Sequence, residues 1–167
     1  MTRRQVTVRM ACVCVLYCAS AWLCPVAAAG PTVPLVCGVS PQGVNFGAYS
    51  ARNASPTDSI GAIKVSCRGT VGDSVSYTVA LSSGASGSFL VRTLNGAAAA
   101  LSYNLYTDAA RSMVWGDGTG NSHAITDGYA LTAVGVTRTY PVYGRLFVGQ
   151  NVAVGSYADS ISVTVTF

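Results

Sequence analysis

Tyr157-Ala158-Asp159-Ser160-Ile161-Ser162-Val163-Thr164-Val165-Thr166-Phe167 is the stretch from which the architecture can be inferred. Apolar and small polar side chains alternate in it from position 161 to the last residue. Side chains of a β-strand point to opposite faces in turn. The apolar side chains that share one face are Ile161, Val163, Val165 and Phe167. Burying these four would contribute roughly 6 to 12 kcal/mol, at about 1.5 to 3 kcal/mol each. The pattern therefore predicts a half-buried strand on which the core depends.

The free edge of this strand needs a partner. No residue of this sequence follows Phe167, so no later strand is available to pair with it. Native proteins normally blunt or cover such edges, because unpaired backbone N–H and C=O groups recruit other chains. The pattern leaves two expectations open: the edge awaits a strand from another polypeptide, or an earlier strand of this chain pairs there.

The N-terminal residues have the features of a secretory signal peptide. Basic residues precede an apolar run over 10–23, and Ala27-Ala28-Ala29 provides the small residues of a cleavage site. The run is shorter than the roughly 20 residues of a spanning helix, which disfavours an uncleaved membrane anchor. We expect a signal peptide over 1–29 and an exported domain over 30–167 that passes through the periplasm.

Removal of residues 1–29 changes both the charge and the cysteine count. It takes away three of the ten basic residues and four of the six cysteines. The remaining charges are nearly balanced and form no basic cluster, so nucleic acid is not an expected partner. Cys37 and Cys67 remain, and two cysteines in an exported protein most simply form a disulfide. A metal site is disfavoured, because His123 is the only histidine.

Short alternating runs separated by turn signals make up the rest of the chain. Gly- and Ser-rich stretches such as 82–88 and 116–121 are expected to be loops, and no window shows a sustained helical period. The segment from Gly30 to Val36 contains two prolines and is expected to be a weak strand at most. Earlier strands are expected at 44–49, 60–67, 74–81, 89–94, 101–106 and 139–147. Short strands with turns between them predict an all-β fold, an antiparallel β-sandwich.

Residues for catalysis are scarce. Each Asp lies in or beside a turn signal or strand end, and His123 is expected to be an exposed loop residue. The loop 117–121 resembles a calcium loop but lacks its later acidic ligands. Trp115 with Tyr103 and Tyr106 suggests sugar stacking, although aromatic residues in strands more often belong to the core. We expect no enzyme activity, cofactor, metal ion or small-molecule substrate.

Several separate blocks of sequence, in the right order, resemble the spore coat protein U domain family. They are Tyr103-Asn104-Leu105-Tyr106-Thr107-Asp108-Ala109-Ala110-Arg111, Trp115-Gly116-Asp117-Gly118, Val142-Tyr143-Gly144-Arg145 and Gly155-Ser156-Tyr157-Ala158-Asp159. Phe46-Gly47, Cys37 and Cys67 also lie where the family has its first strand and disulfide. The resemblance runs from Cys37 to Phe167, and the family includes subunits of archaic, Csu-type chaperone-usher pili.

The resemblance implies an incomplete immunoglobulin-like antiparallel β-sandwich that is completed by a donor strand. A periplasmic pilus chaperone would lend that strand, and the N-terminal extension of a neighbouring pilus subunit would replace it, with an outer-membrane usher as a further partner. The residues expected to contact the chaperone or donor strand are Ile161, Val163, Val165 and Phe167. Stalk subunits of the family carry a longer donor segment than Gly30 to Val36, so a position at the fibre tip is expected.

Two functions from different classes are consistent with these features. The leading expectation is a non-catalytic structural and adhesive subunit of a secreted surface fibre or coat, with a role in cell adhesion and biofilm formation. The alternative is a secreted, self-complete β-sandwich that binds a ligand in a lectin-like manner. The two differ in whether the isolated domain is a soluble monomer without a partner strand.

Overall fold

The computed structural model describes residues 33–167, and the expected signal peptide over 1–29 lies outside them. The described residues form eight strands and one short 3-10 helix. The elements are β1 (Val36–Gln42), β2 (Thr57–Arg68), β3 (Ser74–Leu81), η1 (Gly84–Ser86), β4 (Arg92–Asn95), β5 (Ala100–Tyr106), β6 (Ile125–Ala130), β7 (Gly135–Leu146) and β8 (Val163–Thr166). None of these residues forms a helix long and apolar enough to cross a membrane.

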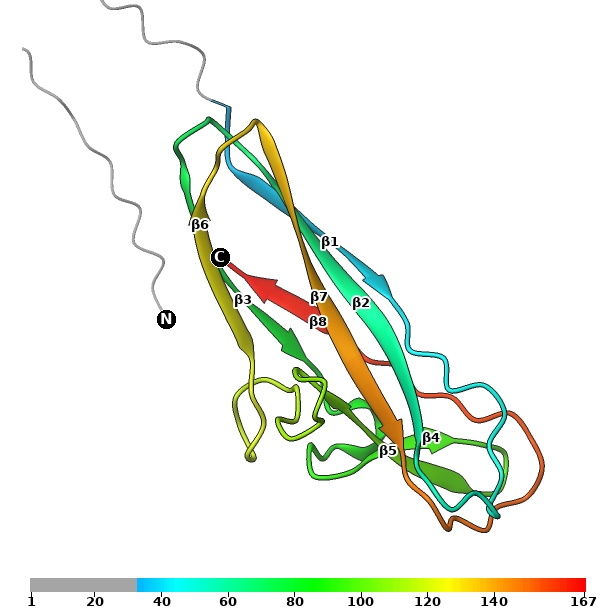
Figure 1. The fold of residues 1–167 in the computed structure, drawn as a ribbon. Helices are drawn as coiled ribbons and strands as arrows, with labels where there is room; N and C mark the ends of the chain where they lie inside the picture. Colours follow the sequence, from blue (N-terminus) through cyan, green and yellow to red (C-terminus); the bar gives the residue numbers. More distant parts are fainter. Residues whose placement is uncertain (1–32) are drawn as a thin grey trace, which may run out of the picture. The chain divides into compact units, whose positions relative to one another are not determined.

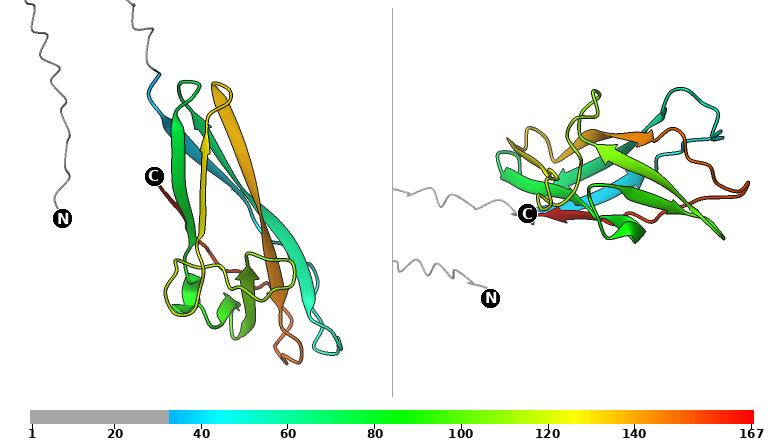
Figure 2. Two further views of the ribbon diagram at one scale, coloured as in Figure 1. Left: turned by 60° about the vertical axis from the view of Figure 1, so that its left-hand side comes forward. Right: turned by 90° about the horizontal axis from the view of Figure 1, so that it is seen from below.

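The strands form two antiparallel sheets (Figure 1). One sheet has the order β1-β2-β7-β5-β4 and the other the order β6-β3-β8. The longest pairing joins β2 and β7 over twelve residues each, from Thr57 opposite Leu146 to Arg68 opposite Gly135. Figure 2 shows these two strands side by side, with the red C-terminal segment in the other layer. The predicted antiparallel β-sandwich is confirmed.

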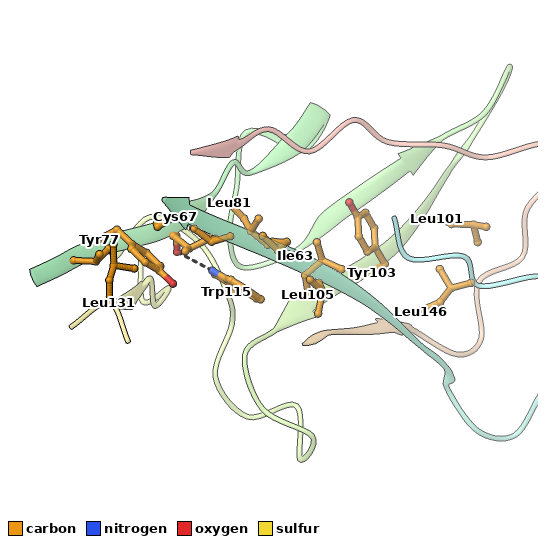
Figure 3. Packing of buried hydrophobic residues seen from close by; sticks show 14 residues of the cluster. Ile63, Cys67, Tyr77, Leu81, Leu101, Tyr103, Leu105, Trp115, Leu131 and Leu146 are labelled. Atoms are coloured by element: carbon orange, nitrogen blue, oxygen red, sulfur yellow. Dashed lines mark hydrogen bonds between the residues drawn. The ribbon is translucent and has the colours of Figure 1, made fainter. Parts of the chain in front are cut away.

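The core lies between the two sheets and follows from the alternation in their central strands. Every second residue of β3 is buried, as are the facing residues at the end of β2. Trp115 fills the space between them: it is fully buried, and its Nε1 donates a hydrogen bond to the backbone oxygen of Val79 at 3.1 Å (Figure 3). Tyr103 and Tyr106 are also buried. These aromatic residues are core residues, so they offer no surface for sugar stacking.

A buried arginine links the loops around this core, and no sequence pattern indicated its burial. Arg92 has no exposed surface. Its guanidinium donates to the backbone oxygens of Ser82 at 2.8 Å and Trp115 at 2.7 Å, and to Asn104 Oδ1 at 2.6 Å. Burial lowers the pKa of Arg92, but a guanidinium stays charged in proteins. Its hydrogen bonds therefore hold β4, β5 and the chain after β3 together.

The strand predicted over 44–49 is wrong. The first strand is β1, and residues 43–50 are irregular. Gly47 has a φ of 68°, in the left-handed region, which ends any extended run there. Val44 and Phe46 pack against the core without pairing with a neighbouring strand. Their alternation reflects burial on one side of an irregular segment.

Two further strands differ from the expectation. The sequence did not predict β6, because Asp127 and Gly128 interrupt its apolar alternation. The strand predicted over 89–94 begins only at Arg92, since the backbone oxygens of Phe89 and Leu90 accept hydrogen bonds from the Asn104 side chain. The remaining predicted strands are present, although β8 is shorter than the alternation suggested.

Cys37 and Cys67 form the predicted disulfide. They lie directly opposite each other on β1 and β2, with their Cα atoms 4.0 Å apart. Cys67 is fully buried, so the bond lies on the inner face of the sheet. The disulfide thereby fixes β1, which has one neighbouring strand within residues 33–167, to β2.

Replacing both cysteines with serine is expected to lower the free energy of unfolding by roughly 3 to 4 kcal/mol, because the bond closes a loop between positions 30 residues apart. Urea denaturation of the oxidised protein and the double variant measures the difference. Wild-type protein unfolded in a reducing agent is the control and should resemble the variant. An unchanged midpoint in the variant would contradict the prediction.

Candidate functional site: an apolar groove between two open strand edges

A groove of about 270 Å³ opens between the two sheets on the side where β1 and β8 lie. Each of these strands is the last of its sheet, so neither has a second neighbour within residues 33–167. The groove is lined by Ile63, Leu94, Tyr103, Leu105 and Val142 of the larger sheet, by Leu81, Ile161 and Val163 on the other side, and by 41–44, Phe46 and Asp159. Side chains that belong to the core therefore form its walls.

The open edge of β8 presents unpaired backbone groups. Ser82 N donates to Ser162 O at 3.0 Å, and the register then places Leu81 opposite Val163. Hydrogen-bonded and non-hydrogen-bonded pairs alternate along an antiparallel ladder. The backbone N–H and C=O groups of Val163 and Val165 therefore point away from β3, toward the groove side.

The open edge of β1 is arranged in the same way. The short Cα–Cα distance of 4.0 Å between Cys37 and Cys67 is typical of a non-hydrogen-bonded pair. By alternation, the backbone groups of Cys37, Val39 and Pro41 point away from β2. A proline at such a position leaves no ladder bond with β2 unmade. Val39 lies opposite fully buried Val65, yet it is 41% exposed, because no other part of residues 33–167 covers it.

The four residues predicted as the partner-strand interface are not all brought to the groove. Ile161 and Val163 line it, and Val165 packs against the core next to it. Phe167 lies beyond the end of β8 and is 65% exposed. The intervening Thr164 and Thr166 are exposed on the other face. The assignment of these residues to a partner strand stays a prediction.

The segment after β1 shapes the groove, although the sequence predicted a paired strand there. Val44 and Phe46 lie against the inner face of β7 at Gly144, where a Cβ atom would come within 2.7 Å of Val44 Cγ1 and 2.9 Å of Phe46 Cζ. Gly61 makes similar room on β2, beside Val44. The Phe46 ring packs edge-on against Tyr103, with 5.8 Å between ring centroids. In the sequence, Gly61 and Gly144 within the predicted strands were the features that could have indicated another segment packing closely there.

Asp159 is a second residue that the sequence analysis did not single out. Its Oδ2 accepts a hydrogen bond from the Tyr103 hydroxyl at 2.7 Å. Its Oδ1 accepts the backbone N–H of Ala85 at 3.0 Å and of Ser160 at 2.8 Å. Burial, and then the bond to Asp159, raise the pKa of Tyr103 far above its ordinary value, so the hydroxyl remains a donor.

The chain changes sheets at Asp159. Just before it, Ala158 exchanges two backbone hydrogen bonds with Asn95 of β4, at 2.8 and 3.0 Å. Just after it, Ser162 pairs with Ser82 at the end of β3. The same segment thus covers the edge of β4 in one sheet and leads into β8 in the other. Asp159 anchors the crossing.

A second hollow of about 760 Å³ continues from the groove. It lies between the irregular segments 44–51 and 150–159 and shares Val44, Phe46, Leu94 and Asp159 with the groove. Its inner polar groups are used: Tyr49 Oη accepts the backbone N–H of Gln150 at 2.8 Å, and Tyr157 Oη donates to Ala153 O at 2.7 Å. The hollow is therefore an extension of the groove past its end.

The chemistry that this site offers is apolar contact and backbone pairing. Across residues 33–167, no three His, Cys, Asp or Glu side chains gather in a way that could hold a metal ion. His123 is exposed in its loop, as expected. Two open strand edges on either side of an apolar groove fit an extended polypeptide whose alternate side chains are apolar.

Comparisons with known proteins agree with this description. A model of the spore coat protein U domain matches residues 24–164. Protein U of Myxococcus xanthus is 37% identical over 67 residues, which cover 40% of this chain and 34% of Protein U.

The fold is also similar to a solved structure. A chain in the crystal structure of the CsuC–CsuE chaperone–tip adhesion subunit pre-assembly complex, from archaic chaperone-usher Csu pili of Acinetobacter baumannii, matches with a TM-score of 0.53 and 21% identity. The match covers 80% of this chain and 40% of that chain. This chain thus spans about a third of Protein U and two-fifths of the matched Csu chain.

Gly144→Ala is expected to lower the free energy of unfolding by about 1 to 3 kcal/mol, because the added methyl group displaces Val44 and Phe46 from the groove. Gly38→Ala in β1 is the matched control, since a Cβ there meets nothing within 4 Å. Thermal or urea unfolding of both variants checks the difference. Equal stability of the two variants would show that the glycine is not needed for this packing.

Proposed function

The chain belongs to the spore coat protein U domain family, and from that premise we propose that it is a non-catalytic structural subunit of a surface fibre, assembled by the chaperone-usher route through donor-strand complementation. In this assembly, a strand from another polypeptide completes the sandwich. A periplasmic chaperone lends the strand first, and a neighbouring subunit replaces it.

The observation that carries the proposal is the groove with two open edges. It exposes walls made of core side chains, and an isolated sandwich would gain stability by covering them. The unpaired groups of Val163 and Val165 on one side, and of Val39 on the other, can form a ladder with one inserted strand. Each such hydrogen bond contributes roughly 0.5 to 1.5 kcal/mol, and apolar side chains of the strand would add their burial.

The geometry supports an interface along β8. Ile161, Val163 and Val165 would interlock with the alternate side chains of the lent strand, because they share the inner face. Phe167 would extend the contact beyond β8, where its exposed ring can meet apolar groups of the chaperone. The outer threonines would face solvent.

The remaining parts of the proposal concern location and position. A signal peptide over 1–29 would direct the chain to the periplasm, an outer-membrane usher would receive it, and the assembled fibre would lie on the cell surface and serve in adhesion and biofilm formation. The short segment from Gly30 to Val36, with Pro31 and Pro34, would be a poor donor strand. A subunit that accepts a strand but donates poorly fits the fibre tip.

The self-complete, lectin-like alternative is not favoured. A self-complete sandwich would cover its core with its own strands, whereas here Val39 is exposed on the inner face. The aromatic residues that suggested sugar stacking are buried.

Co-expression in the periplasm with a Csu-class chaperone tests the proposal. The expected result is a soluble complex, with little soluble monomer when the chaperone is omitted, because the open groove favours self-association. Equal yields of soluble monomer in both cultures would contradict donor-strand complementation and support the self-complete alternative.

Immunogold labelling tests the position of the subunit in the fibre. Label at the fibre ends is expected, and label along whole fibres would contradict the tip assignment.

Val165→Pro is expected to reduce chaperone binding by tenfold or more, because it removes a backbone N–H that points to the groove side while leaving the ladder with β3 intact. Thr164→Asp on the outer face is the matched control and should bind as the wild type does. Co-purification and competition binding measure both. Circular dichroism of each complex or refolded subunit verifies the fold, and equal binding by the two variants would show that β8 is not the docking edge.

A further inference from the structure

We propose that Asp159 determines which donor strand this groove accepts, by selecting a strand with a lysine or arginine at the position that enters beside it. This inference rests on the proposed function and names the chemistry of the partner strand. Of residues 33–167, Asp159 is the single acidic or basic side chain that lines the groove, and it lies where the groove meets the second hollow.

The carboxylate is held in one position. Three hydrogen bonds reach it, from the Tyr103 hydroxyl and from the backbone of Ala85 and Ser160. Gly84 has a φ of 68° and no side chain, and a Cβ there would overlap the Asp159 carboxylate. The surrounding chain is therefore built to receive this charge close to the backbone.

Among the described residues, Asp159 is attracted by the nearby Arg92 charge but has no hydrogen-bonded cationic partner. Within residues 33–167, no Lys, Arg or His side chain forms an ion pair with Asp159. The neighbouring guanidinium of Arg92 directs its hydrogen bonds to Ser82, Trp115 and Asn104 instead. A carboxylate accepts about four hydrogen bonds. Oδ1 receives two and Oδ2 one, so Oδ2 retains an acceptor position for an incoming donor.

Covering the groove changes the surroundings of this carboxylate. A strand with only apolar inward side chains would remove water from Asp159 without supplying a hydrogen bond or a positive charge. Such a loss of hydration is costly for an ionised group. A lysine or arginine supplies a charge-assisted hydrogen bond, and its methylene stem can lie along the apolar walls. The groove is therefore complementary to a strand with several apolar inward residues and one cationic residue at the Asp159 end.

This rule disfavours a second copy of the chain as the donor. The segment from Gly30 to Val36 contains no lysine or arginine. A strand supplied by it would leave Asp159 without a partner. The preferred occupant is accordingly a different polypeptide with a basic residue in an otherwise apolar, alternating segment.

A fused-strand series tests this inference. The full chain, exported to the periplasm, is extended after Phe167 by a Gly/Ser linker and a strand in which valine and threonine alternate. Each inward valine is replaced in turn by lysine, by methionine as an uncharged side chain of similar length, and by glutamate. At one inward position, lysine is expected to raise the Tm above that of methionine by about 4 °C, and glutamate to lower it. High salt should shrink this difference.

Asp159→Asn in the same series should abolish the preference for lysine over methionine. If that variant does not fold, the comparison of lysine with methionine in the wild-type domain still decides the matter. Methionine equal to or better than lysine at every inward position would overturn the role of Asp159. Failure of every fused strand to raise the Tm would instead overturn the strand-accepting groove of the proposed function.

Discussion

An antiparallel strand at the edge of a sheet has backbone groups that nothing in its own sheet can pair, and here two such edges face the same groove. The side chains that point inward from β1 and β8 are the ones whose backbone groups point outward. Val39, Val163 and Val165 each combine an apolar side chain toward the core with an unpaired N–H and C=O toward the opening. A single added strand would cover the apolar side chains and pair the backbone groups at the same time.

Residues 158–162, which pass from one sheet to the other, hold the groove open. Backbone pairing of Ala158 with β4 fixes its start, and pairing of Ser162 with the end of β3 fixes its finish. The crossing between them depends on Asp159, which is tied to the core through Tyr103. Tyr103 belongs both to the buried core and to the lining of the groove. A substitution at Tyr103 therefore affects the stability of the core and the shape of the groove.

The alternation of apolar and polar residues along the sequence predicted the strands that have one buried face. The strict alternation in β3 and β5 and in the last strand was sufficient to assign them, and export made the disulfide between Cys37 and Cys67 the simplest pairing. Residues 44–49 were misassigned because alternate burial does not require a neighbouring strand. The contacts of Gly144 and Asp159 could not be predicted from a short window. Gly144 meets Val44, 100 positions away in sequence, and Asp159 meets Tyr103 and Ala85, 56 and 74 positions away.

Pro41 gives the groove unequal sides. It points its nitrogen toward the opening but has no hydrogen to donate, while Val163 and Val165 keep theirs. An inserted strand would be held more continuously along β8 than along the end of β1. A competing strand would then displace the inserted strand first beside Pro41. The hydrogen bonds of the inserted strand to Val163 and Val165 would break last. The proline would thus make that end of the groove the place where a competing strand enters, a kinetic property that the stability of the filled groove alone would not reveal.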